Sequence, residues 1–99
     1  MLKYILTNKA VEDLTNIWNY TCEHWSEQQA DHYYKMLISN CKEIAKNPDL
    51  GRKYIDIQPD LLGKRINRHI IFYRKIGESR VEITRILHGR MDLKTRILE

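Results

Sequence analysis

The feature that most constrains the fold is a pair of helical patterns separated by only a few residues. In the first pattern, the side chains of one face recur every three or four positions: Ala10, Leu14, Ile17, Trp18, Thr21 and Trp25. This periodicity predicts an amphipathic helix over residues 8–24. Thr7 or Asn8 is expected to provide its N-cap.

The second helical pattern begins at Ser26, which opens a Ser-x-x-Gln capping box. Its stripe consists of Ala30, Tyr34, Leu37, Cys41 and Ile44. The helix should end near Lys46, because Asn47-Pro48 disfavours further helix. Only a couple of residues separate the two helices, so they are predicted to form an antiparallel αα-hairpin.

β-Strand signals occupy most of the remaining chain. We expect short strands at Lys3–Thr7, Lys64–Asn67, His69–Ile76 and Arg80–His88. In the third of these, Ile71 and Tyr73 share one face, and the apolar residues at even positions share the other. Gly77-Glu78-Ser79 is predicted to form the hairpin loop that leads into the last strand.

The order of these elements predicts the fold class. Residues 47–63 contain both prolines and two of the four glycines, so we expect a loop there, with a short turn of helix near Asp60 to Leu62. The predicted order is therefore β-α-α-β-β-β. It indicates a two-layer α+β fold: an N-terminal strand, an αα-hairpin and a three-stranded antiparallel meander. The hairpin should cover one face of the sheet, leaving the other free and partly basic.

Length and charge restrict the class of protein. The 99 residues fit a single domain, 1–99. No stretch approaches the roughly 18 apolar residues of a membrane helix, and the apolar stretch near the start is too short for a signal peptide. We therefore expect a cytoplasmic protein with no membrane partner. Residues 51–99 hold twelve Lys/Arg against six Asp/Glu, whereas residues 1–50 hold five against seven. This asymmetry favours an acidic partner, either nucleic acid or protein.

The sequence indicates no cofactor and no metal site. Cys22 and Cys41 lack the CxxC or Cys/His spacing of zinc sites, and we interpret them as reduced, buried residues. The four histidines are scattered along the chain, and no glycine-rich phosphate loop is present.

Four segments, taken in order, carry a resemblance that spans nearly the whole chain. They are Tyr4-Ile-Leu-Thr7 with Ala10-Val-Glu-Asp-Leu14, Tyr20-Thr21 through Trp25 to Gln29-Ala30 and Tyr33-Tyr34, His69-Ile-Ile-Phe-Tyr-Arg74, and Ile86-Leu-His-Gly-Arg-Met-Asp-Leu93. Each segment alone is weakly specific, and the last is the most telling. In this order and spacing they resemble ParE-type toxins of the RelE/ParE superfamily.

The resemblance implies the toxin component of a type II toxin–antitoxin system. Toxins similar to this chain are encoded beside a ParD-like antitoxin, which neutralises them in a hetero-oligomer. Once freed, ParE-like toxins poison DNA gyrase and block replication. The RelE-like branch of the superfamily instead cuts messenger RNA on the ribosome. Because the branches share a fold, the fold cannot choose between the two activities.

The resemblance also suggests two binding surfaces. The candidate gyrase contacts lie in the C-terminal segment: Arg90, Met91, Asp92 and Arg96. Arg90 and Asp92 could equally pair with each other and cap the final turn. The candidate antitoxin contacts are aromatic residues of the hairpin and cations of the sheet: Trp18, Trp25, Tyr33, Tyr34, Arg65, Arg68 and Arg74. These aromatic residues also fit a buried stripe. The cations fit a solvated face, and few aromatic residues interleave with them to suggest base stacking.

The alternative function is a ribosome-dependent messenger RNA endonuclease. Its acid or base would be His88, with cations to balance the phosphate charge: Arg65, Arg85 and Arg90. RelE-like nucleases keep a Tyr or His near the C-terminus, but this chain ends Leu93-Lys-Thr-Arg-Ile-Leu-Glu99. His88 and His69 also fit structural roles. We therefore assign no catalytic residue and favour a non-enzymatic inhibitor. A third hypothesis is a basic nucleic-acid-binding module without toxicity.

Overall fold

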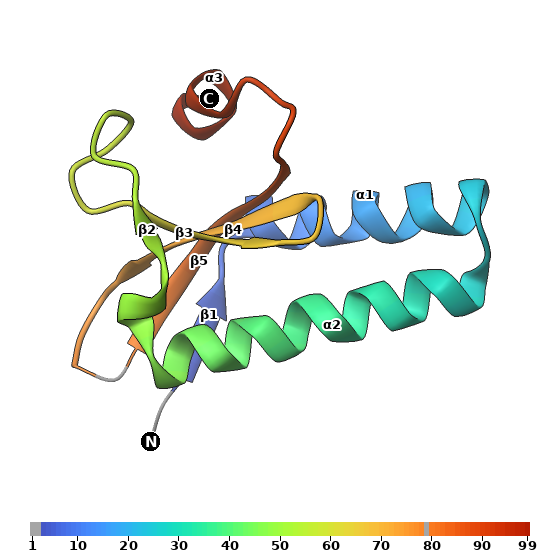
Figure 1. Ribbon diagram of the computed structural model, residues 1–99, viewed down its shortest axis with the longest axis horizontal. Helices are drawn as coiled ribbons and strands as arrows, with labels where there is room; N and C mark the ends of the chain where they lie inside the picture. Colours follow the sequence, from blue (N-terminus) through green and yellow to red (C-terminus); the bar gives the residue numbers. More distant parts are fainter. Residues whose placement is uncertain (1–2, 79) are drawn as a thin grey trace.

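The computed structural model describes residues 3–78 and 80–99 and has a sheet with a long helical hairpin beside it (Figure 1). The elements, in chain order, are β1 (Lys3–Leu6), α1 (Asn8–His24), α2 (Glu27–Lys46), the 3₁₀ turn η1 (Pro48–Leu50), β2 (Arg52–Lys53), β3 (Leu62–Ile66), β4 (His69–Lys75), β5 (Arg80–His88) and α3 (Leu93–Leu98). Both long helices begin at the predicted caps: the hydroxyls of Thr7 and Ser26 accept hydrogen bonds from the backbone N–H groups of Ala10 and Gln29.

The five strands form one mixed sheet in the order β1-β5-β4-β3-β2. Strands β3, β4 and β5 make the predicted antiparallel meander, with β2 added antiparallel at one edge. Strand β1 pairs parallel to β5 at the other edge, with Lys3 opposite Arg80. The αα-hairpin and the meander are thus confirmed, and the chain is an α+β protein.

The main core lies between the hairpin and one face of the sheet. The helices contribute Ala10, Leu14, Leu37, Cys41 and Ile44, and the strands contribute Ile71, Tyr73, Val81, Ile83 and Ile86. Alternation along β4 places Ile71 and Tyr73 on this face, as predicted. Burial of these side chains holds the hairpin against the sheet.

The opposite face of the sheet is covered, so the prediction that it would be free is wrong. Leu61, Ile70, Phe72 and Leu87 form a second apolar cluster there. Four partly buried residues from the loop and from α3 pack against it: Tyr54, Ile57, Leu93 and Ile97. The C-terminal segment was expected to form only a final turn, but it folds into α3 because Leu93 and Ile97, four positions apart, bury one helical face on the cluster.

Several boundaries differ from the sequence predictions. Strand β3 begins at Leu62 rather than Lys64, and the helical turn expected near Asp60 to Leu62 is absent; the loop instead contains η1 and the two-residue strand β2. Ile76 lies just beyond β4, and its N–H donates to the Arg80 carbonyl to close the hairpin. Ser79, part of the predicted loop, lies outside the described residues. Within residues 3–78 and 80–99, no helix has the length and apolar character needed to cross a membrane.

Tyr73 connects the buried sheet to the loop after α2. Its ring is fully buried, and its hydroxyl accepts a hydrogen bond from the Gly51 N–H (2.9 Å) and donates to the Pro48 carbonyl (2.5 Å). A Cβ at Gly51 would collide with the tyrosine ring and hydroxyl. Glycine is therefore required for this close approach.

We predict that Tyr73→Phe lowers the free energy of unfolding by about 2 kcal/mol, because it leaves the Gly51 N–H and the Pro48 carbonyl without their partner. Urea denaturation measures the loss. Tyr34→Phe, at an exposed ring on α2, is the matched control and should change stability by less than about 0.5 kcal/mol. Equal losses in the two variants would contradict the role given to the Tyr73 hydroxyl.

Candidate functional site

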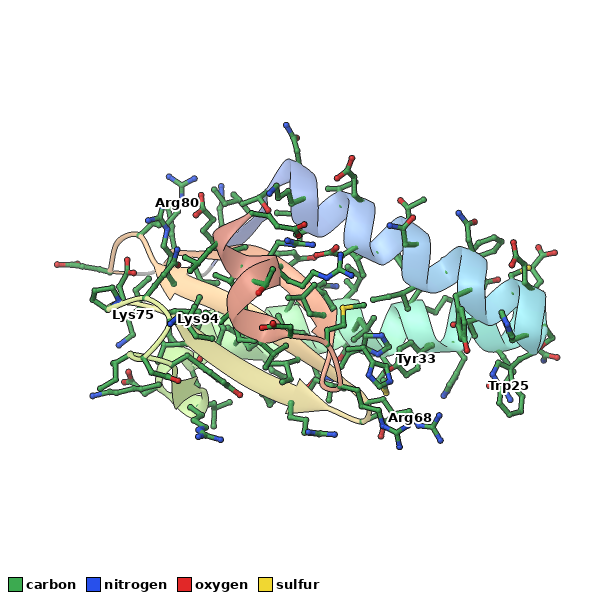
Figure 2. All side chains as sticks on the ribbon, turned by 90° about the horizontal axis from the view of Figure 1, so that it is seen from above. Trp25, Tyr33, Arg68, Lys75, Arg80 and Lys94 are labelled. Carbon is green, nitrogen blue, oxygen red and sulfur yellow. The ribbon has the colours of Figure 1, made fainter. Side chains whose placement is uncertain are left out.

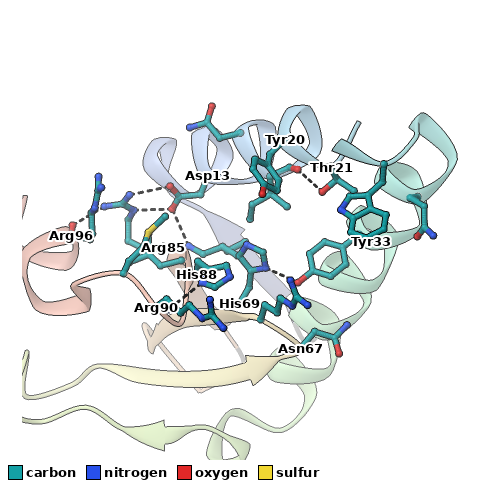
Figure 3. A pocket seen from close by; sticks show the side chains of 18 residues that line it. Asp13, Tyr20, Thr21, Tyr33, Asn67, His69, Arg85, His88, Arg90 and Arg96 are labelled. Atoms are coloured by element: carbon teal, nitrogen blue, oxygen red, sulfur yellow. Dashed lines mark hydrogen bonds and ion pairs between the residues drawn. The ribbon is translucent and has the colours of Figure 1, made fainter. Parts of the chain in front are cut away.

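A groove of about 970 Å³ opens where the helical hairpin meets one end of the sheet (Figure 3). One wall is α1 and the corner of the hairpin, from Asp13 to Trp25, and α2 adds Tyr33. The other wall consists of the β3–β4 turn, the end of β5 and the segment that leads to α3. Figure 2 shows Trp25, Tyr33 and Arg68 toward one end of the molecule, with Arg80 toward the other.

The meander brings two histidines together in this groove. The β4–β5 register places His69 opposite His88, and their ring centroids are 5.3 Å apart in an edge-on arrangement. The turn before His69 is tight, because Asn67 adopts φ 53°, a left-handed conformation that asparagine tolerates better than most residues. This turn places Arg68 at the rim of the groove.

Hydrogen bonds to Nδ1 orient both imidazoles. The Tyr33 hydroxyl is 2.6 Å from His69 Nδ1, and the Arg90 N–H donates to His88 Nδ1 (3.1 Å). Burial, and to a lesser extent the nearby His88, lower the pKa of His69 to about 4 against the opposing effect of Asp13. Burial also raises the pKa of the Tyr33 hydroxyl. His69 is therefore neutral at pH 7, with Tyr33 as its hydrogen-bond partner.

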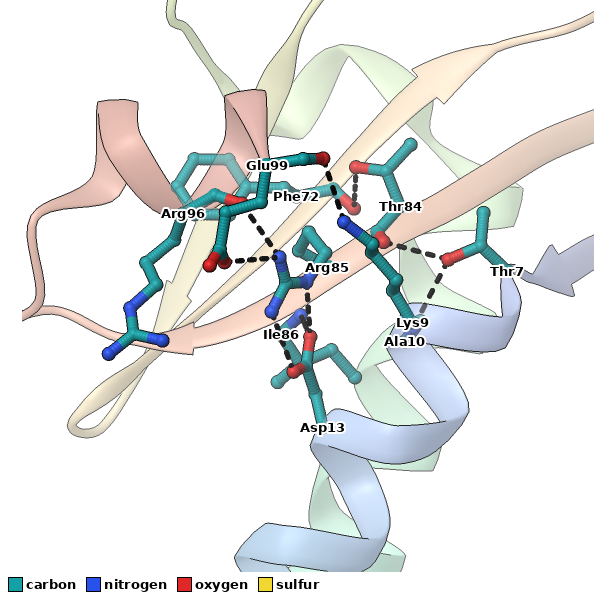
Figure 4. Close-up of polar contacts among 10 residues, drawn as sticks. All are labelled: Thr7, Lys9, Ala10, Asp13, Phe72, Thr84, Arg85, Ile86, Arg96 and Glu99. Atoms are coloured by element: carbon teal, nitrogen blue, oxygen red, sulfur yellow. Dashed lines mark hydrogen bonds and ion pairs between the residues drawn. The ribbon is translucent and has the colours of Figure 1, made fainter.

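An ion pair between Asp13 and Arg85 lies at the sheet end of the groove (Figure 4). The Arg85 Nε and Nη2 atoms donate to the two carboxylate oxygens of Asp13 at 2.8 and 3.0 Å. The Ile86 N–H also donates to Asp13 (3.0 Å). Only 11% of the Asp13 side chain and 13% of the Arg85 side chain are exposed. The hydrogen bond to Asp13 is the main cause that raises the pKa of Arg85.

The remaining guanidinium nitrogen of Arg85 reaches the C-terminal helix. Arg85 Nη1 donates to the Arg96 carbonyl (2.7 Å) and lies 3.7 Å from the Glu99 carboxylate. Lys9 on α1 donates to the Glu99 backbone carbonyl (2.7 Å). The Asp13–Arg85 pair thus joins α1, β5 and α3, the three elements that position one end of the groove.

The predicted gyrase-contact residues divide between the groove and the cap of α3. Arg90, Met91 and Arg96 line the groove. Asp92 does not line it: its carboxylate is the N-cap of α3, accepting hydrogen bonds from the N–H and the hydroxyl of Thr95. The alternative role for Arg90 and Asp92, pairing with each other to cap the final turn, is thus half right. Asp92 caps the last helix, but among the described residues Arg90 is not its ion-pair partner.

The predicted antitoxin-contact residues also divide. Trp25, Tyr33 and Arg68 line the groove, whereas the others lie elsewhere: Trp18, Tyr34, Arg65 and Arg74. Arg74 pairs across the sheet with Glu82 (2.8 Å) and Arg65 donates to the Asn67 carbonyl, with its guanidinium against Gly89. Assigning Trp25 to the buried stripe was wrong, since its side chain is 73% exposed at the C-cap of α1. Placing Tyr34 on the buried stripe of α2 was also wrong, since Tyr34 is exposed, whereas the adjacent Tyr33 is half-buried.

The residues weighed for ribonuclease activity are only partly free for that role. His88, Arg85 and Arg90 line the groove, but Arg65 does not. Arg85 is already bonded to Asp13 and α3. Asp13 was not among the predicted site residues. The spacing of Asp13, Ile17 and Tyr20 could have identified it, because it places all three side chains on one face of the helix. In the structure this face forms a wall of the groove. Among the described residues, no three His, Cys, Asp or Glu side chains are grouped to hold a metal ion.

The family model and the curated proteins that this chain is similar to all describe the same family. A family model described as "ParE toxin of type II toxin-antitoxin system, parDE" matches residues 4–93. Among curated proteins, the chain is 34% identical over 91 residues to "Toxin ParE1" of Mycobacterium tuberculosis, covering 92% of this chain and 93% of that one. It is 32% identical to "Toxin ParE1" of Caulobacter vibrioides, covering 98% and 99%, and 30% identical to "Toxin ParE" of Escherichia coli, covering 100% and 96%.

A solved structure shares the fold. A chain of the "Chromosomal ParDE TA system from P. aeruginosa" superposes with a TM-score of 0.75, at 17% sequence identity, covering 89% of this chain and 96% of that one. At this identity the likeness concerns the fold alone.

We predict that Asp13→Asn lowers the free energy of unfolding by about 3 kcal/mol, because it removes the bonded counter-charge of the largely buried Arg85 guanidinium and leaves only the more exposed Glu99 carboxylate, 3.7 Å away. A double-mutant cycle with Arg85→Gln should give a coupling energy of at least about 1 kcal/mol. The control is Glu82→Gln, which breaks the more exposed pair with Arg74 and should cost less than about 1 kcal/mol. Additive losses at Asp13 and Arg85 would show that the pair is not coupled.

Proposed function

The chain belongs to the ParE toxin family of type II toxin–antitoxin systems, and we propose that it inhibits DNA gyrase until a ParD-like antitoxin neutralises it. The observation that most supports this proposal is the position of the C-terminal segment. Arg90, Met91 and Arg96 line an open groove, and none of the three forms a hydrogen-bonded ion pair with an acidic side chain among the described residues. These side chains are therefore free to bind an acidic or apolar surface of a target.

The same groove suits the proposed antitoxin. Its lining combines apolar side chains, such as Ile17 and Ile86, with cations at the rim. An amphipathic segment with acidic residues would bury its apolar face in such a groove and place its carboxylates against the arginines. The solved relative belongs to a ParDE system, so we expect a ParD-like partner and a hetero-oligomer. Neutralisation would then follow from occupation of the groove.

One observation favours ribonuclease activity as a second candidate. His69 and His88 face one another in a groove that also contains Arg90 and Tyr33, groups able to move a proton and balance phosphate charge. It stands second because His88 Nδ1 is occupied by the Arg90 N–H and His69 Nδ1 by the Tyr33 hydroxyl. Each imidazole keeps only Nε2 for a substrate.

The test is a gyrase assay with purified, antitoxin-free protein, with topoisomerase IV in parallel. We expect loss of supercoiling and accumulation of cleaved DNA with gyrase. Arg90→Ala should weaken inhibition about tenfold, the equivalent of one charge-assisted hydrogen bond. Arg80→Ala, an equal charge change at the start of β5 and outside the groove, should leave inhibition unchanged.

Full gyrase activity at an excess of folded protein would contradict the proposal. Cleavage of ribosome-bound messenger RNA by the same preparation, abolished by His88→Gln, would then establish the second candidate.

A further inference from the structure

The groove combines positive charge with exposed aromatic rings, although the sequence does not interleave them. Arg68 comes from the β3–β4 turn, Arg90 from the segment that follows β5, and Arg96 from α3. The aromatic rings come from the helical hairpin. The chain folds so that both sets line one groove. Little in the sequence indicated base stacking, because few aromatic residues interleave with the cations along the chain. The folded structure nevertheless brings the two sets together.

The rings are accessible on the hairpin side. Trp25 is 73% exposed and Tyr20 is 60% exposed, and the Tyr20 ring stacks on His24 with centroids 4.0 Å apart. Tyr33 is half-buried beside His69. Flat aromatic faces left open beside a cationic groove are the features that proteins use to stack unpaired bases while arginines track the phosphates.

The charged side chains on the sheet side of the groove favour binding of phosphate groups there. Of the described residues that line the groove, Asp13 alone carries a carboxylate, and it is already bonded to Arg85 and the Ile86 N–H. Arg68, Arg90 and Arg96 have no ion-pair partner among the described residues. Phosphodiester oxygens would satisfy these guanidinium groups without desolvating an unpaired carboxylate.

We propose that this groove binds a single-stranded polynucleotide, with Arg68, Arg90 and Arg96 on its phosphates and Trp25 and Tyr20 stacked on its bases. An acidic polypeptide could satisfy the arginines, but it would leave the exposed rings without stacking partners. The proposal goes beyond the proposed inhibition of gyrase, because it does not depend on the source of the strand. The groove would bind DNA held by gyrase and messenger RNA held by the ribosome through the same contacts. Duplex should bind less well, since its bases are already stacked.

The test is fluorescence anisotropy of the antitoxin-free protein with a labelled twelve-nucleotide oligothymidylate at low salt. We expect saturable binding whose affinity falls with salt with a logarithmic slope of about −2, from three phosphate contacts at about 0.7 each. The Arg68→Ala/Arg90→Ala variant should weaken binding at least tenfold and reduce the slope by about 1.4. Trp25→Ala should weaken binding about fivefold or more.

The matched control is Arg80→Ala/Lys94→Ala, which removes the same two charges from a chain of net charge +4 but lies outside the groove. It should bind like the unaltered protein. The same losses in both double variants would reduce the binding to general charge attraction and overturn the proposal, as would absence of binding. Poly-L-glutamate should compete through the arginines alone. An oligonucleotide that binds no more tightly than poly-L-glutamate at equal charge concentration, and that Trp25→Ala does not weaken, would also overturn the proposal, because its bases would then not be stacked on the rings.

A ribo-oligonucleotide of matched length distinguishes the source of the strand. Tighter binding of the deoxy form favours the DNA held by gyrase, and tighter binding of the ribo form favours messenger RNA. Either result supports the strand-binding site. Because the assay contains no gyrase, it can succeed where the gyrase proposal fails and fail where that proposal holds.

Discussion

The ion pair between Asp13 and Arg85 is the interaction on which the arrangement of the groove depends. It joins residues 72 positions apart, with both side chains largely withdrawn from water. Because Asp13 also accepts from the Ile86 N–H, it fixes α1 against the backbone of β5. Removing charge from either partner would leave the other largely buried without its bonded counter-charge, which costs far more than breaking an exposed pair does.

Arg85 extends this connection to the C-terminus. Its third nitrogen holds the Arg96 carbonyl, while Leu93 and Ile97 bury one side of α3 on the second apolar cluster. A six-residue helix has little stability of its own, so these anchors determine where it lies. The groove is consequently a product of long-range contacts, and its opposite walls belong to distant parts of the chain. For this reason candidate contact residues for the antitoxin and for the target line the same groove. On the proposed function, the antitoxin and the target would therefore exclude one another.

Sequence reasoning predicted the features that depend on local patterns. The caps at Thr7 and Ser26, both long helices and the antiparallel meander follow from side-chain spacing and short connections. It failed where tertiary contacts decide. The covering of the second sheet face by α3 depends on Leu93 and Ile97 meeting Phe72 and Leu87, which no local pattern encodes. Trp25 follows the helical spacing yet lies where α1 ends, so there is no core for it to enter.

The most direct test of the claim that this groove is the surface through which the toxin acts is growth of cells that produce the protein without antitoxin. The comparison is between Arg68→Glu/Arg90→Glu, at the groove, and Arg80→Glu/Lys94→Glu, outside it, with folding checked by circular dichroism. We predict that the groove variant permits growth while the distant variant arrests it as the unaltered protein does. Growth arrest by a folded groove variant, undiminished from that of the unaltered protein, would contradict it.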